Sequence, residues 1–308
     1  MQTILGSGGA IGTELAKALT AYTTDIRLVS RQPKKVNPGD ALLPADLTKP
    51  ENVATAIAGS EVVYVTVGFA YSTPVWQQYW LPLVQAVTAA CEQQGAKLVF
   101  FDNVYAIGKG NTHHITEASP ISPTSKKGTI RAAVDQHILQ RIESGKLNAI
   151  IARAPDFFGA KKETSMLMNL AYDNLIKGKK AQWLCNAKVP HTMGYAPEMG
   201  KGTAMLGNTP DAYNQIWNLP TDREAWSGER WVHEMATIMG KSDGVQVLPD
   251  WMAGVIGWFV PIMKELREMN YQFAEPYYFD SSKFSKRFNY EPMSNRAALE
   301  ETLRILAG

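Results

Sequence analysis

The sequence predicts an α/β fold with a doubly wound parallel sheet and a smaller C-terminal lobe. The first observation is that residues 2–12 form a short apolar run that opens into a glycine-rich turn, and a helical pattern follows at 13–19. The second is that strand-like and helical runs alternate through the first half of the chain. This alternation implies right-handed crossovers between parallel strands. Together these observations predict a sheet of the Rossmann type.

Apolar runs mark the further strands and helices of this sheet. We expect strands at 26–30, 61–67, 97–101 and 148–153, and helices at 52–57, 80–94 and 129–144. Beyond about residue 160 the pattern becomes irregular and rich in aromatic residues and Met. We therefore expect a dinucleotide-binding domain over 1–160 and a mixed substrate lobe over 161–308, with segments that return to the main sheet.

Composition excludes several classes of protein. The 308 residues are 45% hydrophobic and carry a net charge of +2, which argues against a nucleic-acid binder or a polybasic membrane binder. Cys91 and Cys185 fit no metal spacing, and the adjacent His113 and His114 lack an evident third ligand, so we expect no metal. The apolar stretch 251–263 is too short to span a bilayer, and no basic leader precedes the first strand, so we expect a cytoplasmic protein.

The glycine-rich turn has the order that a dinucleotide pyrophosphate needs. Gly6, Gly9 and Gly12 form a GxxGxxG spacing between the first strand and its helix. Glycines let the backbone approach the phosphates, and the N–H groups at the start of the helix face the anion. The predicted phosphate contacts are Gly6, Ser7, Gly9, Ala10, Ile11 and Gly12. A plain strand-to-helix turn also uses glycine, so this motif alone is weak evidence.

Ligands of such sheets lie beyond the carboxyl ends of the strands. That rule selects the residues after each predicted strand. The cofactor contacts that it predicts there are Val67, Gly68, Asn103, Ala154 and Asp156.

The end of the second strand indicates which dinucleotide is bound. An NAD site usually has Asp or Glu there, whereas this strand ends in Ser30 and Arg31, which can bind a 2′-phosphate. We therefore predict NADP(H) in preference to NAD(H), the alternative being that Arg31 is only a solvated cation. Asp46 and Leu47 lie where a third strand would end, and Asp46 either accepts from the adenine amino group or caps the following turn.

Several motifs occur in order along nearly the whole chain. They are the glycine loop, the step 45–47, Asn103-Val104-Tyr105, the segment 153–159 and the tail 279–292. This set resembles the extended short-chain dehydrogenase/reductase superfamily, in its branch of NAD(P)-dependent nucleotide-sugar epimerases and dehydratases. The resemblance implies a small-molecule substrate and a homodimer through the helix that carries Arg131.

The chemistry of that family rests on a Ser or Thr, a Tyr and a Lys. When the motif around Tyr105 is aligned, the Ser position falls on Phe101. When 127–131 is aligned, the Tyr and Lys positions fall on Lys127 and Arg131. None of the three residue types is retained, so the resemblance implies an atypical member. Arg131 can still donate to the ribose hydroxyls, because a guanidinium supplies fixed donors.

Three side chains are candidates for the proton donor. Lys127 could act if burial and a nearby cation favour its neutral form, and otherwise belongs to a solvated turn. Tyr105 has a hydroxyl near the expected nicotinamide, or else it packs. Asp102, like Asp156, follows a strand end and is either a loop cap or an acid/base group.

Two functions from different classes follow. The first is an NADP(H)-dependent oxidoreductase or epimerase-like enzyme that acts on a sugar-like or small carbonyl substrate with a non-standard proton donor. The second is a catalytically inert NADP(H)-binding sensor, which the loss of the three family residues favours. The aromatic second lobe favours a small-molecule pocket and hence the enzyme.

Overall fold

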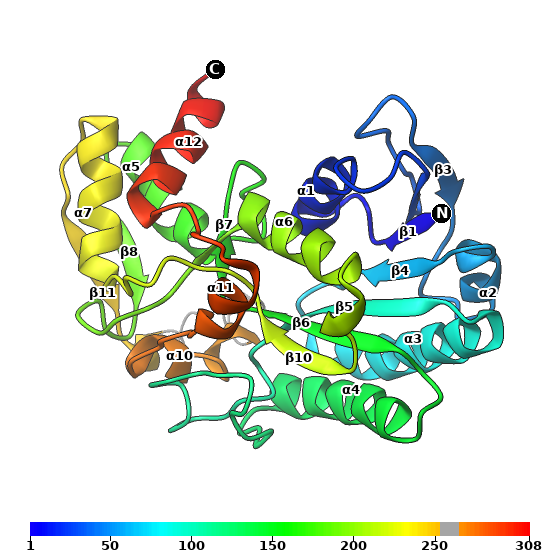
Figure 1. Cartoon of the computed structure of the whole chain (residues 1–308). Coiled ribbons are helices and arrows are strands. Elements are labelled where there is room, and N and C mark those ends of the chain that lie inside the picture. Colours follow the sequence, from blue (N-terminus) through cyan, green and yellow to red (C-terminus); the bar gives the residue numbers. More distant parts are fainter. Residues whose placement is uncertain (253–264) are drawn as a thin grey trace. The chain divides into compact units, whose positions relative to one another are not determined.

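The computed structural model of the chain describes residues 1–252 and 265–308 (Figure 1). Of the apolar stretch 251–263, all but the first two residues lie outside this part. The chain divides into two compact units. Unit 1 comprises Met1–Ala106, Lys127–Ala154 and Pro197–Leu219, and unit 2 comprises Ile107–Lys126, Pro155–Ala196 and Pro220–Gly308. Among the described residues, no helix combines the length and apolar character that crossing a bilayer requires.

Unit 1 is built on a seven-stranded sheet in which every pair of neighbours is parallel. Its strands are β1 (Gln2–Leu5), β2 (Ile26–Ser30), β3 (Ala41–Pro44), β4 (Val62–Val65), β5 (Lys97–Asn103), β6 (Ala149–Ala154) and β10 (Gln215–Asn218). Their order across the sheet is β10-β6-β5-β4-β1-β2-β3. The predicted doubly wound parallel sheet is confirmed, and β10 is a segment that returns to it late in the chain.

Helices cover both faces of this sheet (Figure 1). They are α1 (Ala10–Leu19), α2 (Glu51–Ile57), α3 (Thr73–Gln94), α4 (Lys126–Glu143) and α6 (Ala196–Gly207). On one face α6 packs closely on its neighbours, because a Cβ at Gly200 would meet Glu14 of α1 and one at Gly207 would meet Tyr64 of β4. On the other face, α2, α3 and α4 bury an apolar cluster against the strands, including Trp80, Val134 and Phe100.

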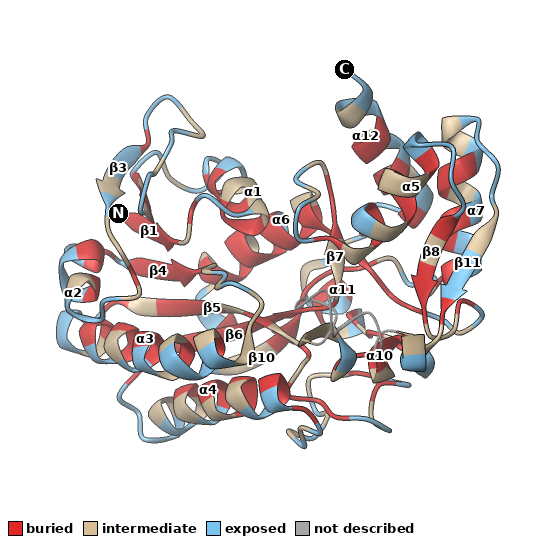
Figure 2. Cartoon of the chain, turned by 180° about the vertical axis from the view of Figure 1, so that it is seen from behind, coloured by how far each residue is buried: buried red, intermediate tan, exposed pale blue. Residues whose placement is uncertain are grey.

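Several boundaries differ from the expected ones by two or more residues, among them the start of α3 and the end of β5. Helix α3 begins at Thr73 rather than near residue 80, because Pro74 lies at its first turn, where a proline costs no hydrogen bond. Strand β5 continues to Asn103, two residues further than expected. The central strands are buried along their length, whereas β3 at the sheet edge is largely exposed (Figure 2). This burial explains why the central strands show continuous apolar runs.

Unit 2 contains short strands and helices around its own apolar core. Two parallel pairs are formed, by β8 (Ala181–Leu184) with β11 (Val245–Leu248) and by β7 (Phe157–Phe158) with β9 (Gly194–Tyr195). The helices within the described residues include η1 (Met168–Tyr172), α5 (Asp173–Ile176), α7 (Gly228–Met239), α10 (Tyr271–Ala274), α11 (Ser282–Phe288) and α12 (Asn295–Ala307). The core joins Phe158, Trp183 and Trp231 to apolar residues of α7 and α12.

Candidate functional site

The loop after β1 and the first turn of α1 each contain a position that only glycine fits. Gly6 has φ +94°, and a Cβ there would lie 2.6 Å from the Val67 nitrogen just after β4. At Gly12, a Cβ would lie 2.6 Å from the Gly6 carbonyl oxygen and 2.9 Å from the Ser7 Cα. These contacts hold the loop tightly between β1, β4 and α1. Gly8 differs, since a Cβ there would meet nothing within 4 Å.

The start of α1 fits the phosphates of a dinucleotide. Gly9 occupies the N-cap and provides no side-chain cap, and the first turn has no acidic residue. The first N–H groups of a helix lack partners within it, so those of Ala10 and Ile11 are suited to an anion. The Ser7 hydroxyl is buried and has no hydrogen-bond partner among the described residues. An orphaned donor, open space at Gly8 and an uncapped helix are the features that an NAD(P) pyrophosphate would use.

The end of β2 brings the predicted adenosine contacts together. Ser30 is half-buried and Arg31 is exposed. Asp46 accepts from both the backbone N–H and the hydroxyl of Thr48, at 3.1 and 2.7 Å. These hydrogen bonds lower the pKa of Asp46, and the charge of Arg31 contributes in the same direction. Asp46 is therefore a turn cap that lies near Arg31, and Leu47 is buried in the core.

The carboxyl ends of β4, β5 and β6 place the remaining unit 1 contacts along one edge. Val67 and Gly68 follow β4, and a Cβ at Gly68 would meet nothing within 4 Å. Asn103 is in register with Ala154, so the ends of β5 and β6 lie side by side. The Asn103 side chain accepts from the backbone N–H of Tyr105 at 3.0 Å and so fixes the turn that carries this tyrosine.

Asp102 and Arg131 form a buried ion pair. Asp102 Oδ1 accepts from Nε of Arg131 at 2.8 Å and also from Nη2, and the guanidinium lies 4.1 Å from the ring centroid of Trp80. Arg131 is only 2% exposed. The ribose contact predicted for Arg131 stays a prediction, but its donors are largely directed to Asp102. Likewise, the Asp102 carboxylate is paired with Arg131 and has a structural role in this conformation, whereas its proposed acid/base role stays a prediction.

Two further charged groups complete this cluster, and neither was identified as a site residue from the sequence. Arg153 lies 4.0 Å from Asp102 Oδ2 and 3.5 Å from Asp135 Oδ2, and all three side chains are fully buried. Burial raises the pKa of Asp135 well above its ordinary value, and the neighbouring Asp102 adds to the effect. Asp135 follows Arg131 by one helical turn, which is the only sequence signal that could have found it.

Lys127 and Tyr105 belong to one polar and aromatic group in unit 1. Lys127 is fully buried, its Nζ donates to Thr73 Oγ1 at 3.0 Å, and it lies 4.7 Å from the ring centroid of Tyr71. The Tyr71 hydroxyl donates to the Tyr105 hydroxyl at 3.3 Å. Tyr105 itself is half-buried. Neither Tyr71 nor Thr73 was identified as a site residue from the sequence, although both follow β4, in one of the segments where ligands of such sheets bind.

Asp156 lies in unit 2, where it contacts a buried histidine. His191 Nε2 lies 3.0 Å from Asp156 Oδ2, and Nδ1 lies 3.1 Å from the Gln272 carbonyl oxygen. The imidazole is stacked between Phe273 and Tyr277, with ring centroids at 4.4 and 4.5 Å. Because the Gln272 carbonyl can only accept, Nδ1 carries a proton. His191 is thus a structural residue that orients Asp156.

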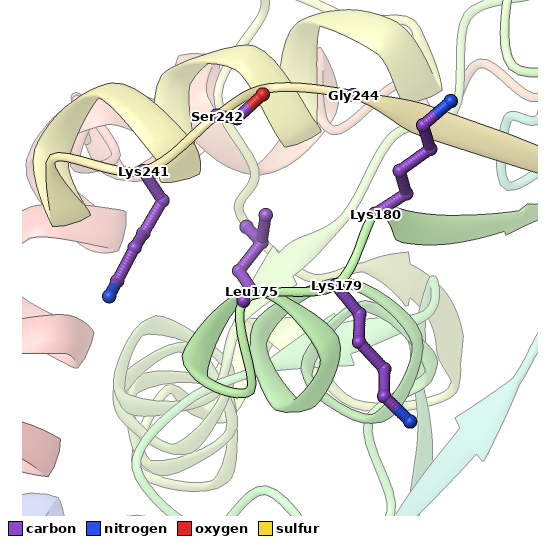
Figure 3. Close-up of a pocket in the computed structure, with 7 residues that line it drawn as sticks. Leu175, Lys179, Lys180, Lys241, Ser242 and Gly244 are labelled. Carbon is purple, nitrogen blue, oxygen red and sulfur yellow. The ribbon is translucent and has the colours of Figure 1, made fainter.

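Unit 2 also has a surface pocket of about 120 Å³. Its lining includes Lys179, Lys180 and Lys241, together with Ser242 and Gly244 near the start of β11. Figure 3 shows the three lysine side chains pointing in different directions. The three ammonium groups of this pocket therefore do not converge on a common point where they could bind one anion.

The model of the NAD dependent epimerase/dehydratase family matches residues 3–219. The chain therefore belongs to this family, which confirms the resemblance seen in the sequence. No curated protein matches the chain by sequence.

Solved structures share the fold. A double mutant of dTDP-glucose 4,6-dehydratase from Streptomyces venezuelae, with NAD bound, is 15% identical with a TM-score of 0.80, covering 100% of this chain and 97% of that one. UDP-glucuronic acid 4-epimerase from Bacillus cereus, in complex with NAD, is 15% identical with a TM-score of 0.79, covering 100% of this chain and 99% of that one. At this identity the likeness establishes the fold alone.

Proposed function

We propose that the chain is an NADP(H)-dependent enzyme of epimerase, dehydratase or reductase type, acting on a sugar-like or small carbonyl substrate. The observation that carries this proposal is the uncapped start of α1 beside the orphaned Ser7 hydroxyl and the open space at Gly8. Family membership supports the same cofactor class. The residues that would hold the pyrophosphate are the loop 6–12 and the first turn of α1.

The preference for NADP(H) rests on the end of β2. An acidic residue that would repel a 2′-phosphate is absent from residues 30–35, whereas Arg31, Lys34 and Lys35 are all exposed there. The Lys35 ammonium donates to the Pro38 carbonyl at 2.7 Å. Arg31 and Lys34 are therefore the better candidates for binding the 2′-phosphate. The related structures named above were crystallised with NAD, so this preference would be a difference between this chain and those proteins.

Tyr105 is the best placed of the three proposed proton donors. Lys127 and Asp102 are buried to 0% and 1% exposure, and they contact Thr73 and Arg131, whereas Tyr105 is half-buried. The nicotinamide, when bound, supplies or accepts the hydride. Tyr105 would give a proton to the substrate oxygen. Asn103, Ala154 and Asp156 remain proposed cofactor contacts.

Calorimetric titration with NADPH, NADP⁺, NADH and NAD⁺ tests the cofactor assignment. We expect tight binding that depends on the 2′-phosphate. Arg31→Ala should weaken NADPH binding by about tenfold or more while leaving NADH unchanged. Lys17→Ala is the matched control, because it removes an exposed cation that pairs with Glu14 on α1. Equal loss of both nucleotides in Arg31→Ala would contradict the NADP(H) preference, and no dinucleotide binding would contradict the whole proposal.

One observation favours the second candidate, an inert NADP(H) sensor. The residues aligned with the family's Tyr and Lys, Lys127 and Arg131, are both buried and contact other side chains. Stereospecific hydride exchange with a panel of sugars and carbonyl compounds separates the two functions. Exchange with any of them supports the enzyme, and tight NADPH binding without exchange supports the sensor.

A cytoplasmic location and a homodimer through α4 complete the proposal. The homodimer comes from the family resemblance, and the location from the composition and the two free cysteines. Sedimentation of the purified protein tests the dimer.

A further inference from the structure

Tyr71 and Tyr105 are fixed against each other by a shared tryptophan. Trp76 stacks on Tyr105 with ring centroids 5.9 Å apart and an interplanar angle of 17°. The same Trp76 meets Tyr71 edge to face, at 5.6 Å and 76°. The two tyrosine rings are perpendicular, and their hydroxyl oxygens are 3.3 Å apart. Because Trp76 is buried on α3, the hydroxyl pair is set by packing rather than by loop geometry alone.

A positive charge lies against this pair. Lys127, at the start of α4, places its ammonium 4.7 Å from the ring centroid of Tyr71 and donates to Thr73, which fixes its position. Arg131, one turn further along α4, has Asp102 as its carboxylate partner, so its charge is largely compensated. An ammonium within about 6 Å of a phenol stabilises negative charge on the aromatic group.

We propose that Tyr71 is a positioning residue for Tyr105, holding it by a hydroxyl–hydroxyl hydrogen bond with Lys127 beside the pair. This inference rests on the proposed function, in which Tyr105 is the proton donor. As the O–H bond of Tyr105 breaks, a new O–H bond forms on the substrate oxygen and the negative charge moves to the Tyr105 oxygen. The Tyr71 hydroxyl donates to that oxygen and stabilises the phenolate, and the Lys127 ammonium adds to this effect.

The acidity of Tyr105 is a direct readout of this role. The protein is labelled with ¹³Cζ-tyrosine, and the Tyr105 resonance is assigned by its loss in Tyr105→Phe. Its ionisation is then followed by NMR as the pH is raised, with circular dichroism showing that the fold persists. Tyr71→Phe removes one hydroxyl, and we expect Tyr105 to become about a tenfold weaker acid. Tyr79→Phe, a half-buried tyrosine on α3 that contacts Phe69, is the matched control and should leave Tyr105 unchanged.

Lys127→Met provides a second measurement that leaves the hydroxyl pair in place. It should also weaken the acidity of Tyr105, because it removes the charge beside Tyr71. An unchanged Tyr105 titration in folded Tyr71→Phe overturns the proposal. If that variant does not fold, an unchanged titration in Lys127→Met overturns it instead.

This experiment needs neither cofactor nor substrate, so its outcome is separate from that of the proposed function. If Tyr105 titrates unchanged in Tyr71→Phe while the native protein binds NADPH, only the role of Tyr71 is removed. Failure of every dinucleotide to bind the native protein removes the proposed function and, with it, the catalytic meaning of the tyrosine pair.

Discussion

We expect Gly8→Ala and Gly12→Ala to have opposite effects on stability, although Gly8 lies just before α1 and Gly12 lies in its first turn. At Gly12 the added Cβ would lie 2.6 Å from the Gly6 oxygen and 2.9 Å from the Ser7 Cα. Both are backbone atoms, so α1 must move away from the loop. Such overpacking costs about 1–3 kcal/mol, and the better helix propensity of Ala returns about 1 kcal/mol. Because backbone atoms cannot rotate away as a flexible side chain would, the cost should lie near the upper end of this range, so Gly12→Ala should lower the free energy of unfolding by about 2 kcal/mol.

At Gly8 the same methyl group meets open space, and the backbone is outside the left-handed region. Gly8→Ala should therefore leave stability unchanged or raise it by about 0.4–1 kcal/mol, because alanine lowers the conformational entropy of the unfolded chain. Its methyl group would occupy the space in front of α1, so we expect NADPH affinity to fall by about tenfold or more.

Urea unfolding and calorimetric titration of both variants provide the two measurements. Native-like unfolding of Gly12→Ala would refute the packing argument. Native-like NADPH binding by Gly8→Ala would show that the open space in front of α1 is not where the phosphates bind. A destabilised Gly8→Ala would refute the assignment of that space as open.

Three further predictions concern groups whose pKa is perturbed. Burial raises the native pKa of Asp135, so this group costs the native protein stability as the pH rises above about 4. The melting temperature of Asp135→Asn should therefore increase relative to that of the native protein between pH 5 and pH 8, and a constant difference would contradict this. The hydrogen bond from Arg141 lowers the pKa of Glu92. Glu92→Gln should therefore melt at a lower temperature than the native protein at pH 7, and this difference should vanish as the pH falls below about 4. Equal melting temperatures at pH 7 would show that the pair does not contribute. Burial raises the pKa of Cys91 to about 12, so a thiol reagent at pH 8 should modify it only after unfolding, as a mass-spectrometric time course would show.

The parts of the fold that sequence could predict are those determined locally. The loop around Gly6 and Gly12 is one, because its contacts join β1 to the next few residues and to the strand beside it. Strand β2 is another, since the strand observed at Ile26–Ser30 has the bounds expected from its apolar run. Strand β10 could not be assigned to the sheet in this way, because it pairs with β6, which ended some sixty residues earlier.

Charged residues of α4 were the hardest to interpret. Arg131 and Asp135 are on one face of the helix, and a pattern of charges at this spacing is typical of a solvated surface. Here that face is turned to the sheet, where Asp102 and Arg153 provide charges of opposite sign. Pairing partners come from β5 and β6, so only the assembled sheet shows why these charges can be buried. Tyr71 was missed for a similar reason, because its partner Tyr105 follows a different strand.

The same chemistry can persist in a family when its residues change places. In the alignment, the family's Tyr position is held by Lys127, so the phenol and the ammonium are not where the family pattern puts them. In the structure an ammonium from α4 still lies beside a phenol, but the phenol is Tyr71, which follows β4. Tyr71 in turn contacts Tyr105, after β5. If the tyrosine pair acts as we propose, then Lys127 supports the donor rather than acting as one. Lys127→Met should then leave NADPH binding intact while weakening the acidity of Tyr105.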